Sequence, residues 1–255
     1  MATIDDNTAT PPTGELLVGR DQELASFGKI LRDKQAQLVV LTGGPGVGKS
    51  SLLRKFQSLG EEAGWNTAKL PDSIRINQEA TPDSFSTQLQ AVLSVPTSKS
   101  FIEKRSTSAV DSATGHPLLP IVERLSGLAP FLLTIDGYRP GPEFGEWFEK
   151  VFLNDVKRSA AAIVIVLAER PQAATKMTPF ADQIIQLGPL DDNSIRQHFT
   201  ELGRKISPPM NEMEIQEYTK AAQEDTEVLE RLTRVLRLAL PAPNDADRST
   251  VTTVE

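Results

Sequence analysis

The most informative part of this sequence is Gly43-Gly44-Pro45-Gly46-Val47-Gly48-Lys49-Ser50. It has the spacing G-x-x-x-x-G-K-[ST], in which a glycine-rich turn leads directly into a lysine and a hydroxyl residue. The apolar run 38–41 predicts a short buried strand before this turn. Residues 50–59 predict a helix after it, because apolar side chains recur there on one side. The turn therefore lies in the strand–turn–helix context that such spacing requires.

Glycines in this pattern let the backbone direct its N–H groups toward a common centre, since they adopt positive φ and allow a ligand to approach closely. The N-terminus of the following helix adds partial positive charge at the same point. We therefore expect the turn to bind the phosphates of ATP, with Lys49 at the β- and γ-phosphates and the Ser50 hydroxyl on Mg²⁺. The residues expected to contact the nucleotide here are Gly43, Gly44, Pro45, Gly46, Val47, Gly48, Lys49, Ser50 and Ser51.

A phosphate site of this type also needs a carboxylate across the Mg²⁺ from Ser50, at the end of a buried strand. Asp136 directly follows the apolar run 131–135 and is expected to be this second metal ligand and a catalytic residue. The alternative is that Asp136 caps the next helix.

The position after Asp136 raises a question about hydrolysis. Many P-loop ATPases have an acid there that activates the attacking water, whereas this chain has Gly137. Nothing in the sequence selects a substitute among Glu143, Glu146 and Glu169. Loss of a general base lowers a rate by about 10²–10⁴-fold. We therefore expect nucleotide binding with weak hydrolysis, or none.

Apolar strands and helical patterns alternate through most of the chain, which predicts an α/β fold with a parallel sheet covered on both faces. Further strands are expected at 65–70, 131–135, 160–168 and 184–187, and helices at 82–93, 117–128 and 143–156. After residue 189 the pattern is wholly helical, with helices expected at 191–202 and 211–240. We predict a domain at 15–190, a small helical domain at 191–240, and disordered tails at 1–14 and 241–255.

Composition excludes several classes of protein. The chain has 255 residues and a formal charge of −7, which argues against nucleic acid as a partner. It has no cysteine and two histidines, which argues against thiol catalysis, Cys-ligated zinc and a His-rich metal site. No apolar stretch approaches the about 20 residues of a membrane span, and residues 1–14 are too polar for a signal peptide. We expect a soluble, cytoplasmic protein.

Together these motifs resemble the STAND branch of the AAA-like P-loop ATPases, which includes the NACHT and NB-ARC proteins, over residues 16–203. The stretch Leu17-Val18-Gly19-Arg20-Asp21-Gln22-Glu23-Leu24 is similar to the hhGRExE element that precedes the phosphate loop in that group. The resemblance implies that Gly19 and Arg20 lie near the adenine. Taken alone, the same stretch is a turn followed by a helix, with Arg20 an ordinary surface residue as the alternative.

Two later elements also resemble that branch. The strand at 163–167 leads into Glu169-Arg170-Pro171 and is similar to a sensor-1 strand, which implies that Arg170 faces the γ-phosphate as a catalytic residue. Leu187-Gly188-Pro189-Leu190 resembles the GxP element before a helical lid, which implies that Pro189 packs against the adenine. The alternatives are a solvent-exposed strand end for Arg170 and a simple boundary turn for Gly188-Pro189.

The resemblance implies a P-loop NTPase fold with five parallel strands in the order 5-1-4-3-2, counted along the chain, flanking helices and a C-terminal helical lid. The region 211–240 lacks the glycine-proline break usual in such lids. His198, on the expected lid, is predicted to lie on the surface, with a nucleotide sensor as the alternative. The apolar residues that recur at three- and four-residue spacing near the C-terminus predict lid packing, with self-association or a protein effector as the alternative: Val228, Leu229, Leu232, Val235, Leu236 and Ala239.

Two functional hypotheses follow. The first is an ATP- and Mg²⁺-binding nucleotide switch of the STAND/AAA-like type with weak hydrolysis, which couples the nucleotide state to lid position and partner association. The alternative is a non-hydrolysing ATP-binding scaffold or interaction module. A third hypothesis, an origin- or helicase-loader-like ATPase that acts on DNA, is disfavoured by the acidic balance of the chain.

Overall fold

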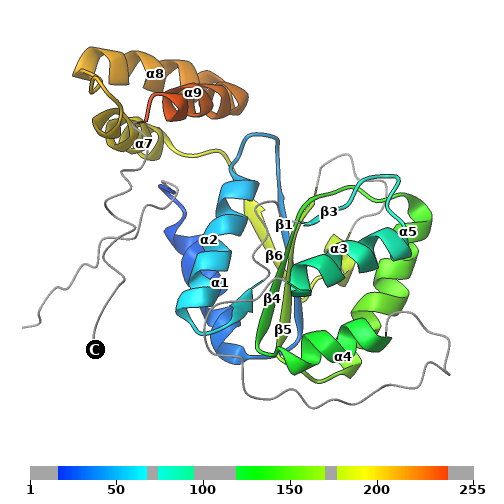
Figure 1. Cartoon of the computed structure of the whole chain (residues 1–255). Helices are drawn as coiled ribbons and strands as arrows, with labels where there is room; N and C mark the ends of the chain where they lie inside the picture. Colours follow the sequence, from blue (N-terminus) through cyan, green and yellow to red (C-terminus); the bar gives the residue numbers. More distant parts are fainter. Residues whose placement is uncertain (1–16, 68–73, 95–118, 170–176, 241–255) are drawn as a thin grey trace, which may run out of the picture.

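The computed structural model describes residues 17–67, 74–94, 119–169 and 177–240. A twisted parallel sheet with helices on both faces forms the larger part, and three C-terminal helices lie together to one side of it (Figure 1). The strands are β1 (Gln37–Gly43), β2 (Asn66–Thr67), β3 (Ile74–Arg75), β4 (Phe131–Tyr138), β5 (Ile163–Glu169) and β6 (Gln183–Leu187).

The strand order is β2-β4-β5-β1-β6, and all pairs are parallel. Strands β2 and β3 both pair with β4, β2 at residues 131–132 and β3 at 135–136, so they share one edge position. The sheet therefore has five strand positions in the predicted order, which confirms the P-loop NTPase fold. Strand β3 was not expected from the sequence, because two residues are too few to show a periodic pattern.

Helices α1 (Asp21–Asp33) and α2 (Lys49–Glu62) cover one face of the sheet. The rings of Phe27 and Phe56 stack between them, with their centroids 3.8 Å apart. The other face is covered by α3 (Pro82–Ser94), α4 (Leu119–Gly127), α5 (Pro142–Trp147), the π-helical turn η1 (Phe148–Leu153) and α6 (Asn154–Arg158). A short 3-10 turn, η2 (Thr178–Phe180), precedes β6.

Strand β5 shows why the sheet is buried on both sides. Ile163, Ile165 and Leu167 belong to one hydrophobic cluster, whereas the alternating Val164, Val166 and Ala168 belong to the other. Successive side chains of a strand point to opposite faces, so a run that is apolar at every position fills two cores. The most apolar stretch of the chain accordingly lies near the centre of the sheet.

The C-terminal bundle consists of α7 (Asp192–Lys205), α8 (Glu212–Glu224) and α9 (Thr226–Leu238), which share a third hydrophobic cluster. The single helical region expected at 211–240 is wrong. Asp225 is extended, with φ −155° and ψ 125°, and its side chain accepts a hydrogen bond from the Glu227 amide. This N-cap ends α8 and begins α9 without a glycine or a proline.

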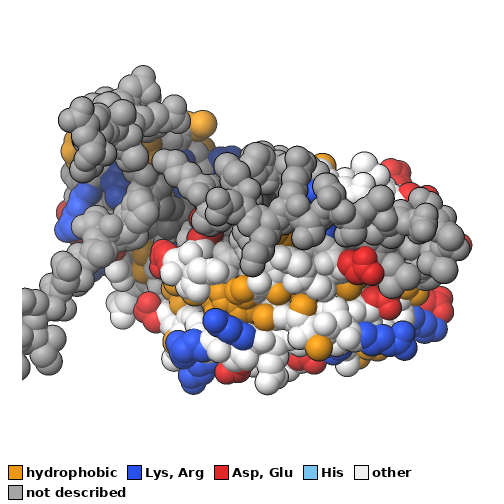
Figure 2. Space-filling view, turned by 60° about the horizontal axis from the view of Figure 1, so that its bottom comes forward, with side chains coloured by type: hydrophobic (Ala, Val, Ile, Leu, Met, Phe, Trp, Pro, Cys, Tyr) orange, Lys and Arg blue, Asp and Glu red, His pale blue; other side chains and the backbone are white. Residues whose placement is uncertain are grey.

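The face of the molecule in Figure 2 mixes charged and hydrophobic side chains among the described residues. On the face in Figure 2, described Lys and Arg side chains lie among Asp and Glu side chains, with a strip of hydrophobic side chains between them. In the described ranges, no helix combines the length and hydrophobicity needed to cross a membrane.

Close packing of α2 on the sheet makes Gly60 a test of this fold. A β-carbon at Gly60 would lie 2.8 Å from Cδ2 of the buried Leu132, whereas one at Gly28, in α1, meets only the end of Arg32 at 3.7 Å. We expect Gly60→Ala to be less stable than Gly28→Ala by about 1–3 kcal/mol, the usual cost of overpacking. Denaturant unfolding of the two variants measures the difference, and equal midpoints would contradict the packing described.

Candidate nucleotide-binding site

The turn between β1 and α2 has the conformation that its glycines permit. Gly46 and Gly48 have φ of 73° and 93°, values that strain any residue with a β-carbon. Helix α2 begins directly afterwards at Lys49, and no side chain caps its N-terminus. The backbone N–H groups of such a helix N-terminus lie at the positive end of the helix dipole, where they suit an anion.

Lys49 lies across this turn. Its ammonium group donates hydrogen bonds to the carbonyl oxygens of Gly43, at 2.8 Å, and Gly44, at 2.6 Å. The lysine therefore closes the loop and keeps its charge beside the turn. A phosphate oxygen can take the place of these carbonyls at the same ammonium.

A cavity of about 570 Å³ lies between this loop and the C-terminal bundle. The loop and α2 contribute to its wall Gly46, Val47, Gly48, Lys49, Ser50, Ser51 and Arg54. The bundle contributes His198, Leu229, Glu230, Thr233, Arg234, Arg237 and Leu238. Leu17, Val18, Arg20, Asp136 and Leu190 complete it. Its volume is that of a pocket for a small molecule or cofactor.

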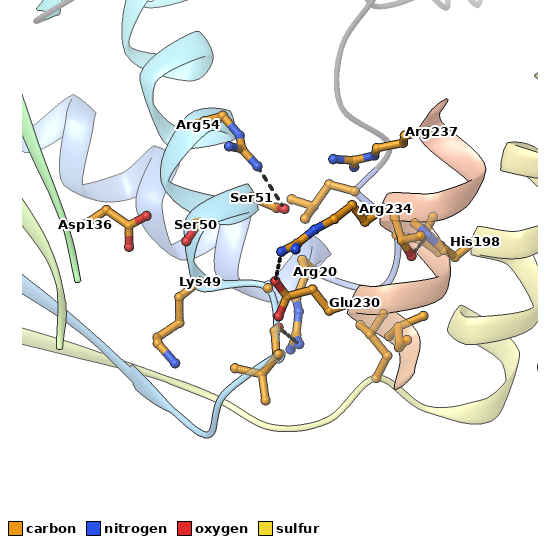
Figure 3. A pocket seen from close by; sticks show the side chains of 18 of the residues that line it. Arg20, Lys49, Ser50, Ser51, Arg54, Asp136, His198, Glu230, Arg234 and Arg237 are labelled. Carbon is orange, nitrogen blue, oxygen red and sulfur yellow. Dashed lines mark hydrogen bonds and ion pairs between the residues drawn. The ribbon is translucent and has the colours of Figure 1, made fainter. Parts of the chain in front are cut away.

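The two expected magnesium ligands come together at one side of this cavity. Asp136, half-buried in β4, and Ser50, in the first turn of α2, both line the wall and point toward one another in Figure 3. Within the described ranges, no three acidic or histidine residues gather to hold a metal ion. A hydroxyl and one carboxylate suit Mg²⁺ that is bound together with phosphates.

Several expected site residues do not line the cavity. Gly43 and Gly44 are not in the wall, but their carbonyl oxygens accept hydrogen bonds from Lys49. Gly19, Pro45 and Pro189 are also not in the wall, whereas Leu190, next to Pro189, is. Arg170 lies outside the described residues.

The wall of the cavity is rich in positive charge, which the sequence did not reveal. Arg54 from α2 and Arg237 from α9 point into the space between these helices (Figure 3). Arg234, also from α9, forms an exposed ion pair with Glu230, 3.2 Å apart. Three- and four-residue steps place 230, 234 and 237 on one side of a helix. The sequence therefore predicts that these three residues share one side of a helix, but it gives no indication that α9 lies near the loop.

Arg20 is buried, with 6% of its side chain exposed, so the alternative of an ordinary surface residue is wrong. Its Nη2 donates to the carbonyl oxygens of Val47 and Gly188, both at 2.8 Å. Its Nη1 pairs with Glu23 at 3.1 Å. The guanidinium group is therefore directed at protein acceptors, although Arg20 also lines the cavity.

The three glutamates considered as substitutes for an acid at position 137 do not line the cavity. Glu169 is buried and accepts hydrogen bonds from the Met177 amide, at 2.6 Å, and the Thr178 hydroxyl, at 2.9 Å. Glu146 is exposed and pairs with Lys150. Among described residues, the acids in the wall are Asp136 and Glu230.

His198 was expected on the surface, and this is wrong. It is buried between α7 and α9, and its Nε2 is hydrogen-bonded to the Thr233 hydroxyl at 2.9 Å. Burial, together with the positive charge of Arg237, lowers the pKa of His198 from 6.5 to about 4, with Glu201 acting weakly in the opposite direction. The ring is therefore neutral at physiological pH. Helical periodicity did not reveal this burial because a polar residue at this position is typical of an exposed face.

The lowered pKa of His198 predicts a pH-dependent stability. The unfolded chain takes up this proton near pH 6.5 and the folded chain only near pH 4, so the unfolding free energy falls as the pH drops through that interval. We expect the His198 contribution to the loss to reach about 3 kcal/mol at its lower end. Denaturant unfolding of wild type and His198→Gln at several pH values measures it. An unchanged pH slope in the variant would contradict the burial of the imidazole.

The loop and Asp136 lie in a segment of the chain that matches a known protein family. Residues 16–137, which include the loop and Asp136, match the family described as AAA ATPase domain. The Thermotoga maritima RuvB Holliday junction branch migration motor has a similar fold, with 13% identity, a TM-score of 0.50 and coverage of 91% of this chain and 68% of that one. A variant of the same motor gives a TM-score of 0.54 at 13% identity, with the same two coverages.

The replication initiator DnaA bound to AMPPCP and single-stranded DNA is also similar, with 12% identity, a TM-score of 0.53 and coverage of 92% of this chain and 66% of that one. This chain thus spans about two thirds of these proteins, and such identities show a common fold. No curated protein sequence matches it. Residues 16–137 are therefore similar to an AAA ATPase domain, and the chain has the P-loop NTPase fold.

Proposed function

We propose that this chain is a nucleotide switch of the STAND/AAA-like type that binds ATP and Mg²⁺ between the phosphate loop and the C-terminal bundle. One observation carries the proposal: the cavity wall combines Lys49, Ser50 and Asp136 from the α/β part with Arg234 and Arg237 from α9. A ligand in this cavity contacts both parts at once. The charge of the ligand therefore affects the position of the bundle relative to the loop.

Each residue has a role in this proposal. Lys49 binds the β- and γ-phosphates, while Ser50 and Asp136 hold Mg²⁺, which neutralises phosphate charge when it is bound. Arg234 and Arg237 reach the phosphates from the bundle, and Arg170 is proposed at the γ-phosphate. Leu17, Val18 and Leu190 supply apolar wall for the adenine. Gly19, Arg20 and Pro189 are proposed to lie beside it.

The switch depends on how the two nucleotides differ. ATP has one phosphate more than ADP, so it gains more from the α9 arginines when the bundle is close to the loop. A ligand shifts a conformational equilibrium only by the difference in its affinity for the two states. We propose that residues 15–190 and 191–240 act as the two moving parts. Val235, with 55% of its surface exposed on α9, lies where a protein effector or second copy is proposed to bind.

A non-hydrolysing scaffold is the second candidate. Gly137 occupies the position of the water-activating acid, and none of the three alternative glutamates lines the cavity. In this candidate, ATP stabilises the contact between the loop and the bundle without being consumed.

The site is tested by the loss of its lysine. We expect Lys49→Ala to abolish binding of a fluorescent ATP analogue, because an ammonium–phosphate contact in a partly buried site is lost. Lys29→Ala, at an exposed position of α1, is the matched control and should bind as wild type does. Equal affinity in the Lys49 variant would refute the site.

Hydrolysis separates the two candidates. Under single-turnover conditions, with enzyme in excess over radiolabelled ATP, we expect slow phosphate release that Lys49→Ala and Asp136→Asn both remove. The missing base predicts a rate about 10²–10⁴-fold below that of an ATPase that has one. Release no faster from wild type than from Lys49→Ala would exclude the switch with hydrolysis and leave the scaffold.

A further inference from the structure

Arg20 connects parts of the chain that are far apart in sequence. One nitrogen, Nη2, donates to the carbonyls of Val47, in the phosphate loop, and Gly188, in the linker from β6 to α7. The other terminal nitrogen pairs with Glu23 in the first turn of α1. A guanidinium group presents its donors in a rigid fork, so these acceptors are fixed relative to one another.

The bond to Val47 affects the phosphate site directly. The carbonyl of Val47 and the amide of Gly48 belong to one planar trans peptide group and point in opposite directions. By holding the carbonyl on one side, Arg20 sets the direction of the Gly48 N–H on the other. This amide is among those expected to face the phosphates, and the peptide lies in the cavity wall.

The bond to Gly188 affects the bundle. Gly188 directly follows β6, and α7 begins four residues later at Asp192. The residue before Arg20 supports the same linker: Gly19 has φ +69°, and a β-carbon there would lie 2.3 Å from the Ser194 hydroxyl and 3.4 Å from Leu190. The Gly19–Arg20 pair is therefore packed and hydrogen-bonded against the beginning of the bundle.

We propose that Arg20 is a positioning residue that couples the phosphate loop to the C-terminal bundle, because a single buried nitrogen holds both the Val47–Gly48 peptide and the linker to α7. If phosphate binding reorients the Val47–Gly48 peptide, the hydrogen bond from Arg20 Nη2 to the Val47 carbonyl changes. The hydrogen bond from the same nitrogen to Gly188, in the linker to α7, then changes with it. The proposal rests on the nucleotide switch described above and names a residue through which its two parts communicate.

The test measures ATP binding and the response of the bundle separately. ATP affinity is measured by titration, and the response of the bundle is measured as the nucleotide-dependent change in amide hydrogen exchange over α7 and α9. Arg20→Lys keeps the charge but lacks the fork, so its single ammonium cannot keep the same geometry to both carbonyls. Arg32→Lys, at an exposed position of α1, the helix that begins directly after Arg20, is the matched control.

We expect ATP to change the exchange of α7 and α9 in wild type and in Arg32→Lys. Arg20→Lys should still bind ATP, with affinity reduced by about 10-fold or less, the effect of one weakened charged hydrogen bond. Its bundle should show no change in exchange on binding. A double variant, Arg20→Gln with Glu23→Gln, removes both members of the ion pair together and should behave in the same way. It replaces the lysine variant if circular dichroism shows that Arg20→Lys is unfolded.

The possible failures are distinguishable. No ATP binding by wild type refutes the proposed function itself. ATP binding by wild type without any response of the bundle, or a wild-type response in either Arg20 variant, overturns the coupling role and leaves the nucleotide site standing. Complete loss of ATP binding in a folded Arg20 variant also overturns it, because Arg20 would then serve binding alone.

Discussion

The hydrogen bonds from Lys49 to the carbonyls of Gly43 and Gly44 close the turn on which the rest of the site depends. The turn joins β1, an interior strand of the sheet, to the uncapped N-terminus of α2. Parallel pairing of β1 with β5 and β6 directs the carboxyl ends of these strands to one edge, where ligands of open α/β sheets bind. The neighbouring β4 brings Asp136 to the same edge.

The bundle adds positive charge to the site. The α/β part supplies the loop, Lys49, two serine hydroxyls, Asp136, Arg20 and Arg54, and α9 adds Arg234 and Arg237 to the same cavity. The neutral His198 lies between α7 and α9, where a protonated ring would repel Arg237. A cavity with cations on two separately packed parts suits a multiply charged anion, and it makes the position of one part sensitive to that anion.

The sequence was sufficient for five strands and for the strand–turn–helix context of the phosphate loop, because both depend on local patterns: apolar runs that end at turn residues, and glycines at fixed spacing. The strand order came from the family resemblance, and the two-residue strand β3 was missed. The sequence failed where the deciding contact is distant. Arg20 bonds to Gly188, 168 positions away, and Arg234 and Arg237 line the same cavity as the loop only because α9 folds back toward it. The break at Asp225 was missed for another reason, since an extended cap between two helices has no glycine or proline to mark it.

Assigned ¹⁵N–¹H spectra recorded during titration with Mg²⁺-ADP test the central claim most directly, since they report on the loop amides one by one. We expect the amide resonances of Gly46, Val47, Gly48, Lys49 and Ser50 to shift most strongly and to saturate together. Saturable binding that leaves these resonances in place while others shift would contradict it.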